Sequence, residues 1–321
     1  MINFLRSNQP FSFIISGCFI LLLVLPAGYF NESITAIEYP YNFLIDVPKI
    51  VYQLLLLVIL FFTSSQINRI VNQSIIFSKS YYVPGLIYLI LMCFYCPVEY
   101  NFLPVISNFF IVMAMKQFFK IFRNEPCRNL IFNASSWLII SCFFLPVNIL
   151  LIPIVWLILL IIRPFEWREY IMPLVVLLAV SLYIVPFGLI NGELNNWLVA
   201  WWELSFCQNY WPNKYILILY LFFLALSLLF SINPISKTFI RSSNRYKKVT
   251  WVLISMLFFT ATIGAVSFLI FKITTPLVFS FFIPISILIS NGIIIGKRKW
   301  LVDLLLVLFL FSLVLTTYLP G

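Results

Sequence analysis

The strongest constraint on this chain is a series of long apolar runs separated by short polar breaks. A helix needs about 20 apolar residues to cross a bilayer core of roughly 30 Å, and its backbone bonds internally there. The pattern predicts an all-α, polytopic transmembrane helical bundle of about 11 spans, forming a single integral membrane domain over residues 1–321. The runs are 11–30, 49–66, 81–97, 103–119, 129–145, 147–163, 170–190, 214–233, 250–271, 275–295 and 300–318.

Composition supports this class and leaves little chain for a second domain. Hydrophobic residues make up 63% of the sequence and charged residues 9%. Soluble domains average about 45–50% apolar and roughly 25% charged residues. The first run is expected to be retained as a span, because Pro26 and the acidic stretch after it do not form a good signal-peptide cleavage site. Near Pro146 the stretch 129–163 is expected to break into two antiparallel helices.

The basic residues predict an orientation. If the spans alternate from a cytoplasmic N-terminus, all but three of the 20 Lys and Arg residues fall on the cytoplasmic side; the exceptions are Lys49, Lys214 and Lys272. This bias indicates a cytoplasmic N-terminus, a periplasmic C-terminus and a place in the bacterial inner membrane. The net charge of +10 is therefore attributed to cytoplasmic loops, and no nucleic-acid partner is expected.

Two longer loops are predicted on the outer face, at 31–48 and 191–213. In the second, Trp197 and Trp201 share one helical face, with Trp202 and Glu203 beside them. We expect an interfacial helix over 193–206 in the outer headgroup layer. It is either an aromatic anchor without chemistry or a platform that docks lipid over an active site.

Candidate catalytic groups are few, because the chain has no histidine. Outer-face carboxylates remain as a general base, and Glu38 and Asp46 are the first choices since they flank Tyr39-Pro40-Tyr41, where a sugar face can stack. The alternative is that these carboxylates only solvate a loop. No nucleotide, zinc-protease or hydrolase motif occurs, no metal site is predicted, and no cofactor follows from the sequence.

On the inner side, the loop from Arg163 to Tyr170 has two interpretations. Arg163 and Arg168 can bind an acidic headgroup or a soluble partner, or the loop is a tight turn held by Arg–Glu pairs and anchored by its aromatic residues. Uncharged polar residues in the runs either line a cavity or bond helix to helix. They are Asn108, Asn133, Ser135, Ser136, Asn148 and Asn291. The spacing of Cys93 and Cys96 suits a redox or metal pair, but their apolar context favours core packing.

Residues 101–190 carry a resemblance. The segments 101–104, 107–110, 130–134 and 163–169 resemble an uncharacterised multi-spanning family of Bacteroidota inner membranes, which has no established activity. The layout is also similar to polytopic glycosyltransferases that use polyprenyl-linked sugars, and to polysaccharide polymerases. That similarity implies an inside N-terminus, an acidic first outer loop and outer interfacial helices.

Three classes of function follow from these features. The first is cell-envelope biogenesis, acting on polyprenyl-linked glycan at the periplasmic face. The second is a non-catalytic membrane subunit that assembles with other membrane proteins. The third is a transporter or flippase, which the lack of acidic residues at predicted midplanes disfavours.

Overall fold

The structure is a computed structural model. It describes residues 10–24, 49–74, 81–99, 102–122, 127–190, 214–271 and 275–295, together with residues 307, 308 and 311. The described elements are helical and include no strand. They are α2 (Pro10–Val24), α4 (Lys49–Gln73), α5 (Val83–Glu99), α6 (Phe102–Ile121), α7 (Arg128–Phe144), the 3₁₀ helix η2 (Pro146–Leu151), α8 (Ile154–Ile162), α9 (Trp167–Tyr170), α10 (Met172–Ile190), α12 (Lys214–Arg241), α13 (Asn244–Phe271) and α14 (Thr275–Ile295).

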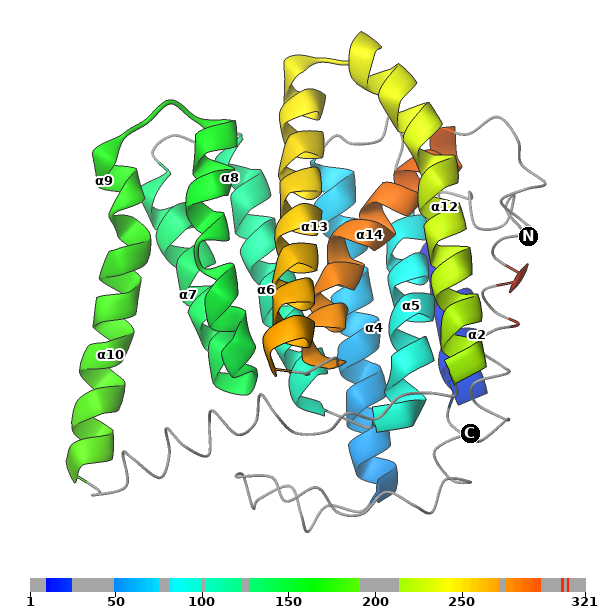
Figure 1. The fold of residues 1–321 in the computed structure, drawn as a ribbon, viewed down its shortest axis with the longest axis horizontal. Helices are drawn as coiled ribbons and strands as arrows, with labels where there is room; N and C mark the ends of the chain where they lie inside the picture. Colours follow the sequence, from blue (N-terminus) through cyan, green and yellow to red (C-terminus); the bar gives the residue numbers. More distant parts are fainter. Residues whose placement is uncertain are drawn as a thin grey trace.

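The helices run up and down in an antiparallel bundle (Figure 1). Every predicted run from 11–30 to 275–295 contains a helix, which confirms the all-helical class. The run 300–318 lies outside the described residues apart from three positions. By length and composition, one described helix, Leu54–Gln73, is long and apolar enough to cross a membrane. Shorter apolar helices are Val83–Cys93, Val147–Ile162 and Ser280–Ile295.

The predicted break after α7 is confirmed. Leu145 has an extended backbone, with φ −143° and ψ 100°, as expected for a residue that precedes a proline. Pro146 then begins η2, and α8 starts after Pro153. The chain reverses here, so α8 returns toward the end at which α7 began (Figure 1).

Several helices extend past the apolar runs into polar sequence. α4 continues to Gln73, and α12 continues through Pro234 to Arg241. The final turns of α12 are held by packing, since Phe239 meets Trp251 of α13 edge to face at 6.1 Å between ring centroids. Hydropathy alone therefore underestimates their length, because tertiary contacts continue a helix where the apolar run stops.

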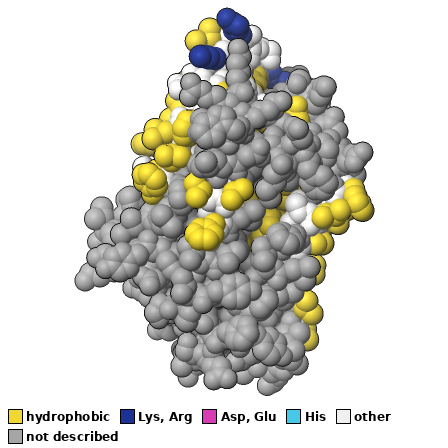
Figure 2. Space-filling view, turned by 90° about the vertical axis from the view of Figure 1, so that its right-hand side faces the viewer, with side chains coloured by type: hydrophobic (Ala, Val, Ile, Leu, Met, Phe, Trp, Pro, Cys, Tyr) yellow, Lys and Arg dark blue, Asp and Glu magenta, His cyan; other side chains and the backbone are white. Residues whose placement is uncertain are grey.

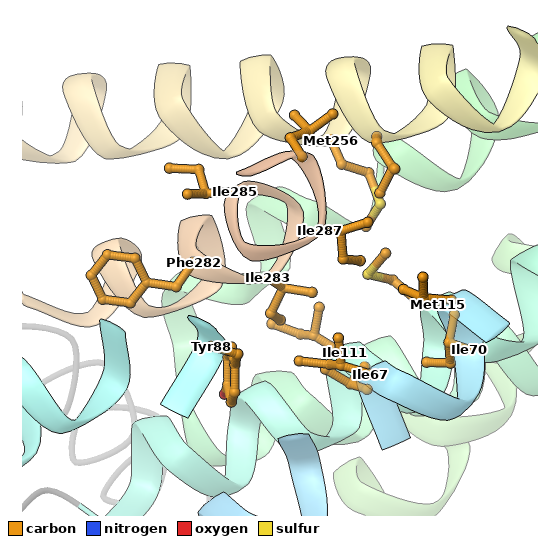
Figure 3. Close-up of a cluster of buried hydrophobic side chains, with 14 of the residues drawn as sticks. Ile67, Ile70, Tyr88, Ile111, Met115, Met256, Phe282, Ile283, Ile285 and Ile287 are labelled. Atoms are coloured by element: carbon orange, nitrogen blue, oxygen red, sulfur yellow. The ribbon is translucent and has the colours of Figure 1, made fainter. Parts of the chain in front are cut away.

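The core lies around α5 and α14, which are buried on nearly all sides. Every described α5 side chain from Val83 to Cys93 is buried, as is every α14 side chain from Ser280 to Ile293 except Phe281. Figure 3 shows core side chains of α4, α5, α6, α13 and α14 converging, with Tyr88 and Phe282 among the largest fully buried residues. Helices that are apolar all round occupy such central positions.

Basic residues gather at one end of the bundle, where α6 turns to α7, α8 to α9 and α12 to α13 (Figure 1). We call this the basic end. All described Lys and Arg residues lie there except Lys49 and Lys214, which begin α4 and α12 at the opposite end. Figure 2 shows Lys and Arg side chains at this end, with hydrophobic side chains further down the same face.

Candidate functional site

The predicted catalytic pair and the tryptophan platform lie outside the described residues. This applies to Glu38 and Asp46, and to the predicted interfacial helix 193–206. The proposed binding residues in that helix are Trp197, Trp201, Trp202 and Glu203. Their predicted roles therefore stay predictions. Of the predicted site residues, only Arg163 and Arg168 lie in the described part of the chain.

Arg163 and Arg168 have different environments in the loop between α8 and α10. Arg163 directly follows α8, and its Nη1 lies 3.5 Å from Oε1 of the buried Glu169. Arg168 is exposed, with its guanidinium carbon 5.5 Å from the ring centroid of its neighbour Trp167. Of the two candidate arginines, Arg163 thus makes an ion pair within the loop, and Arg168 faces outward.

The aromatic residues of this loop also have distinct roles. The indole Nε1 of Trp156 in α8 donates a hydrogen bond to the carbonyl of Tyr170 at 2.9 Å. Phe165 packs on the Tyr170 ring, with centroids 4.7 Å apart. Trp167 is 61% exposed. The predicted turn is therefore present with one Arg–Glu pair and with Tyr170 packed in it, while Trp167, the other predicted anchor, is exposed.

Asn148 of η2 bonds to two other helices in the interior, at the end opposite the basic end. Its Nδ2 donates to Oγ of Ser107 in α6, and it lies 3.5 Å from Oγ of Ser141 in α7. Oγ of Ser107 donates to the carbonyl of Ser141 at 3.3 Å. All three residues are buried. This network ties η2 to the interface between α6 and α7.

A second interior network joins α12, α13 and α14. Nδ2 of Asn291 donates to the hydroxyl of Tyr246 at 2.8 Å, and that hydroxyl lies 3.2 Å from Oγ1 of Thr238. Asn291 and Tyr246 are buried. Together with Asn148, this confirms that interior asparagines bond helix to helix. Asn133, in contrast, is exposed, and Ser136 bonds to the carbonyl of Phe132 in its own helix.

Sequence reasoning missed two asparagines that bind the backbone around the start of a neighbouring helix. Asn68 and Asn72 lie one turn apart on α4. Oδ1 of Asn68 accepts from the N–H of Gly85 at 2.7 Å, and Oδ1 of Asn72 accepts from the N–H of Tyr81 at 3.0 Å. The first-turn N–H groups of a helix lack partners within that helix, so Asn68 caps α5, while Asn72 binds the backbone two residues before α5 begins. The sequence offered one signal for these contacts, namely two asparagines four residues apart just after the apolar run 49–66.

Lysines satisfy acceptors at the basic end in a similar way. Nζ of Lys248 in α13 donates to the carbonyl of Ile162, the last residue of α8, at 2.7 Å. Nζ of Lys116 in α6 donates to Oε1 of Gln66 in α4 at 3.2 Å. Lys248 thus satisfies a free carbonyl at the C-terminus of α8 and complements the dipole of that helix. Both lysines therefore connect helices distant in sequence.

The described interior contains no acid–base or metal constellation. Within it, no group of three His, Cys, Asp or Glu side chains is placed to hold a metal ion. Of the described acidic side chains, Glu166 directly precedes α9 and Glu169 lies within it, at the basic end. Cys93 is fully buried among apolar side chains, as a core residue would be. The described part of the interior thus suits packing and helix bonding.

Comparison with known proteins adds no relative from which a role can be transferred. The sequence matches no protein-family model, and no curated protein or solved structure is significantly similar to it.

Proposed function

We propose that this chain is a multi-pass protein of the bacterial inner membrane, with about 11 spans and its basic end in the cytoplasm. The observation that carries the proposal is the separation of charge along the bundle, since only Lys49 and Lys214 among the described basic residues lie at the far end. Cytoplasmic loops of membrane proteins are rich in Lys and Arg. This orientation places the N-terminus inside and the C-terminus in the periplasm.

The outward-facing side chains of the described helices support a lipid environment. Large apolar residues are exposed on α4, α8, α10, α12 and α13; examples are Val58 (66%), Leu160 (61%), Leu182 (64%), Leu229 (66%) and Phe258 (69%). Soluble monomers rarely expose contiguous apolar patches of more than a few hundred Å². In a bilayer such side chains contact acyl chains at no cost, so exposure around the bundle is expected there.

Cysteine labelling in intact cells tests the orientation. In a cysteine-free background we would restore Cys207, and in a second variant introduce Ser243→Cys in the exposed turn between α12 and α13. A membrane-impermeant maleimide should label Cys207 from outside, and should label the Ser243→Cys protein only after the cells are permeabilised. The native Cys127 is unsuitable as the inner reporter because it is buried. Labelling of the Ser243→Cys protein in intact cells would reverse the orientation.

Within this topology we propose that the protein acts in cell-envelope biogenesis on a lipid-linked glycan at the periplasmic face. The support is chemical: the predicted outer loops combine carboxylates with tryptophans, and lipid-linked sugar phosphates present their reactive bonds at that surface. The chain has no histidine, and we propose that the general base there is one of the acidic residues. Glu38 and Asp46 are the proposed catalytic groups, and Trp197, Trp201, Trp202 and Glu203 the proposed lipid platform.

Amide substitutions of the outer carboxylates test the proposed activity. Glu→Gln or Asp→Asn at Glu38, Asp46, Glu32, Glu193 and Glu203 is expected to reduce the activity by at least about 100-fold at one position or more, because amides do not act as bases. The measurement is the profile of lipid-linked and surface glycans in a deletion strain complemented by each variant. Glu166→Gln, at the basic end, serves as the control. Full complementation by all five variants at normal protein levels would eliminate the enzyme proposal.

The second candidate is a non-catalytic membrane subunit. It is favoured by the Asn148 and Asn291 networks, in which interior polar groups bond neighbouring helices. A subunit would tolerate all five amide substitutions yet lose function when its contacts with other membrane proteins are disrupted. A transporter or flippase is the third candidate, and the lack of predicted midplane acids makes proton or sodium coupling harder to achieve.

A further inference from the structure

Three basic residues lie close together where α4 and α6 approach the basic end. Gln66 and Arg69 are three residues apart on α4, and Lys116 and Lys120 are four apart on α6, so each pair shares one face of its helix. The hydrogen bond from Nζ of Lys116 to Oε1 of Gln66, at 3.2 Å, brings these two faces together. The apolar side chains next to this bond also meet across the two helices, since Figure 3 shows Ile70 of α4 close to Met115 of α6.

The direction of the helices places the outer two cations at one level. α4 and α6 both run toward the basic end (Figure 1). Arg69 and Lys120 therefore each lie about one turn beyond the Gln66–Lys116 bond, on neighbouring helices. Lys116 is half-buried and Gln66 is buried, so the cluster begins inside the bundle and opens at its surface.

No described acidic side chain neutralises this cluster. The described carboxylates are those of Glu166 and Glu169, and Glu169 pairs with Arg163. Glu125, which follows Lys120 in the sequence, lies outside the described residues. The C-terminal dipole of α6 favours a cation in its last turn, which accounts for Lys120. It does not account for Lys116, a turn deeper, because dipole stabilisation falls off within the last turn.

We propose that Arg69, Lys116 and Lys120, held in register by Gln66, bind a phosphate group at the basic end. A phosphate offers several acceptor oxygens and at least one negative charge, so one group can satisfy three converging cations. Arginine adds bidentate geometry, and lysine acts as a point charge. The phosphate belongs either to the headgroup of an anionic phospholipid or to a soluble phosphate compound. The site does not depend on the activity proposed for the opposite face.

The test uses the full chain purified in an uncharged detergent. Dioleoylphosphatidylglycerol and sodium pyrophosphate are titrated separately, with dioleoylphosphatidylcholine as the neutral lipid, and the thermal unfolding midpoint is followed. A bound ligand raises the midpoint saturably. The double variant Arg69→Gln/Lys120→Gln should weaken the response by roughly thirtyfold in half-saturating concentration, as expected for the loss of two cations near an anionic surface. The thermal unfolding midpoint of this double variant without ligand shows whether the variant folds.

A matched double variant separates the site from net charge. Lys237→Gln/Arg241→Gln also removes one lysine and one arginine, both exposed on α12 at the basic end. It should leave half-saturation within about twofold of the wild type. A response to phosphatidylglycerol alone assigns the site to a lipid headgroup, and a response to pyrophosphate as well assigns it to soluble phosphate compounds. The proposal fails if the wild type shows no saturable response to either compound, or if both double variants weaken it equally.

Discussion

The substitution Gly292→Val is expected to lower the free energy of unfolding by about 3 kcal/mol or more. Overpacking at a rigid contact typically costs about 1–3 kcal/mol and sometimes exceeds that. Gly292 of α14 faces Ser231 of α12. A Cβ at position 292 would lie 2.4 Å from Cα, Cβ and Oγ of Ser231. Since one of these atoms is backbone, no side-chain rotation relieves the contact, and the two helices would have to separate.

Thermal unfolding of the purified protein in detergent measures this effect. The variant Gly292→Ala should already be destabilised, and Ser231→Gly in the same chain should recover part of the loss, because it removes Cβ and Oγ but leaves Cα. Ser231→Gly alone removes a hydroxyl that donates to the carbonyl of Ser227 at 2.8 Å and serves as the reference. If Gly292→Val unfolds at the wild-type temperature, the close approach of α12 and α14 is wrong.

Gly85→Ala is expected to have the second largest effect, about 2–3 kcal/mol, because it combines overpacking with a strained hydrogen bond. A Cβ at this position would lie 2.5 Å from both Nδ2 of Asn68 and the backbone carbonyl oxygen of Ser64. Asn68 cannot move aside freely, since its Oδ1 accepts the Gly85 N–H at 2.7 Å. The alanine would therefore push α5 away from α4 and weaken the cap.

Two comparisons make this prediction specific. Asn68→Ala removes the hydrogen bond without adding an atom to α5, and should cost about 1 kcal/mol. Gly17→Ala is the matched glycine control, because its nearest contact is the Phe61 ring at 3.0 Å, a side chain that can shift. Unfolding midpoints measured in one detergent should fall in the order Gly17→Ala, Asn68→Ala, Gly85→Ala, with the last variant lowest. Equal midpoints for the two glycine variants would contradict the packing of α4 on α5.

The sequence was enough to predict where the helices lie along the chain, but not which helices pack against one another. Apolar runs locate helices because each residue contributes independently to hydropathy. Pro146 indicated the break because proline removes a backbone donor and disfavours a helical residue before it, although α12 continues through Pro234. The runs that become α5 and α10 are both strongly apolar, yet α5 is central and α10 exposes Leu178 and Leu182. In the proposed membrane topology both environments are apolar, so hydropathy does not distinguish a core helix from a peripheral one.

The same limit applies to the candidate site. Asn148 and Asn291 stood out because they are amides in apolar runs, and both bond across helices. Tyr246, the partner of Asn291, could not be identified, because the pairing depends on α13 meeting α14. An Arg–Glu pairing in the loop from Arg163 to Tyr170 was predicted because the charges lie in one short loop, and the structure shows it between Arg163 and Glu169. Local pairs follow from sequence spacing, and partners on distant helices require the tertiary arrangement.

The central place of α14 has a consequence for how the protein is made. α14 (Thr275–Ile295) packs against α5, α12 and α13, although the ribosome releases it after all of them. Chains emerge from the N-terminus onward, so the earlier helices form before their central neighbour exists. Until then the Tyr246 hydroxyl lacks Asn291, and the buried face of α5 remains uncovered. A chain cut before α14 would therefore lose part of its core and not a peripheral helix.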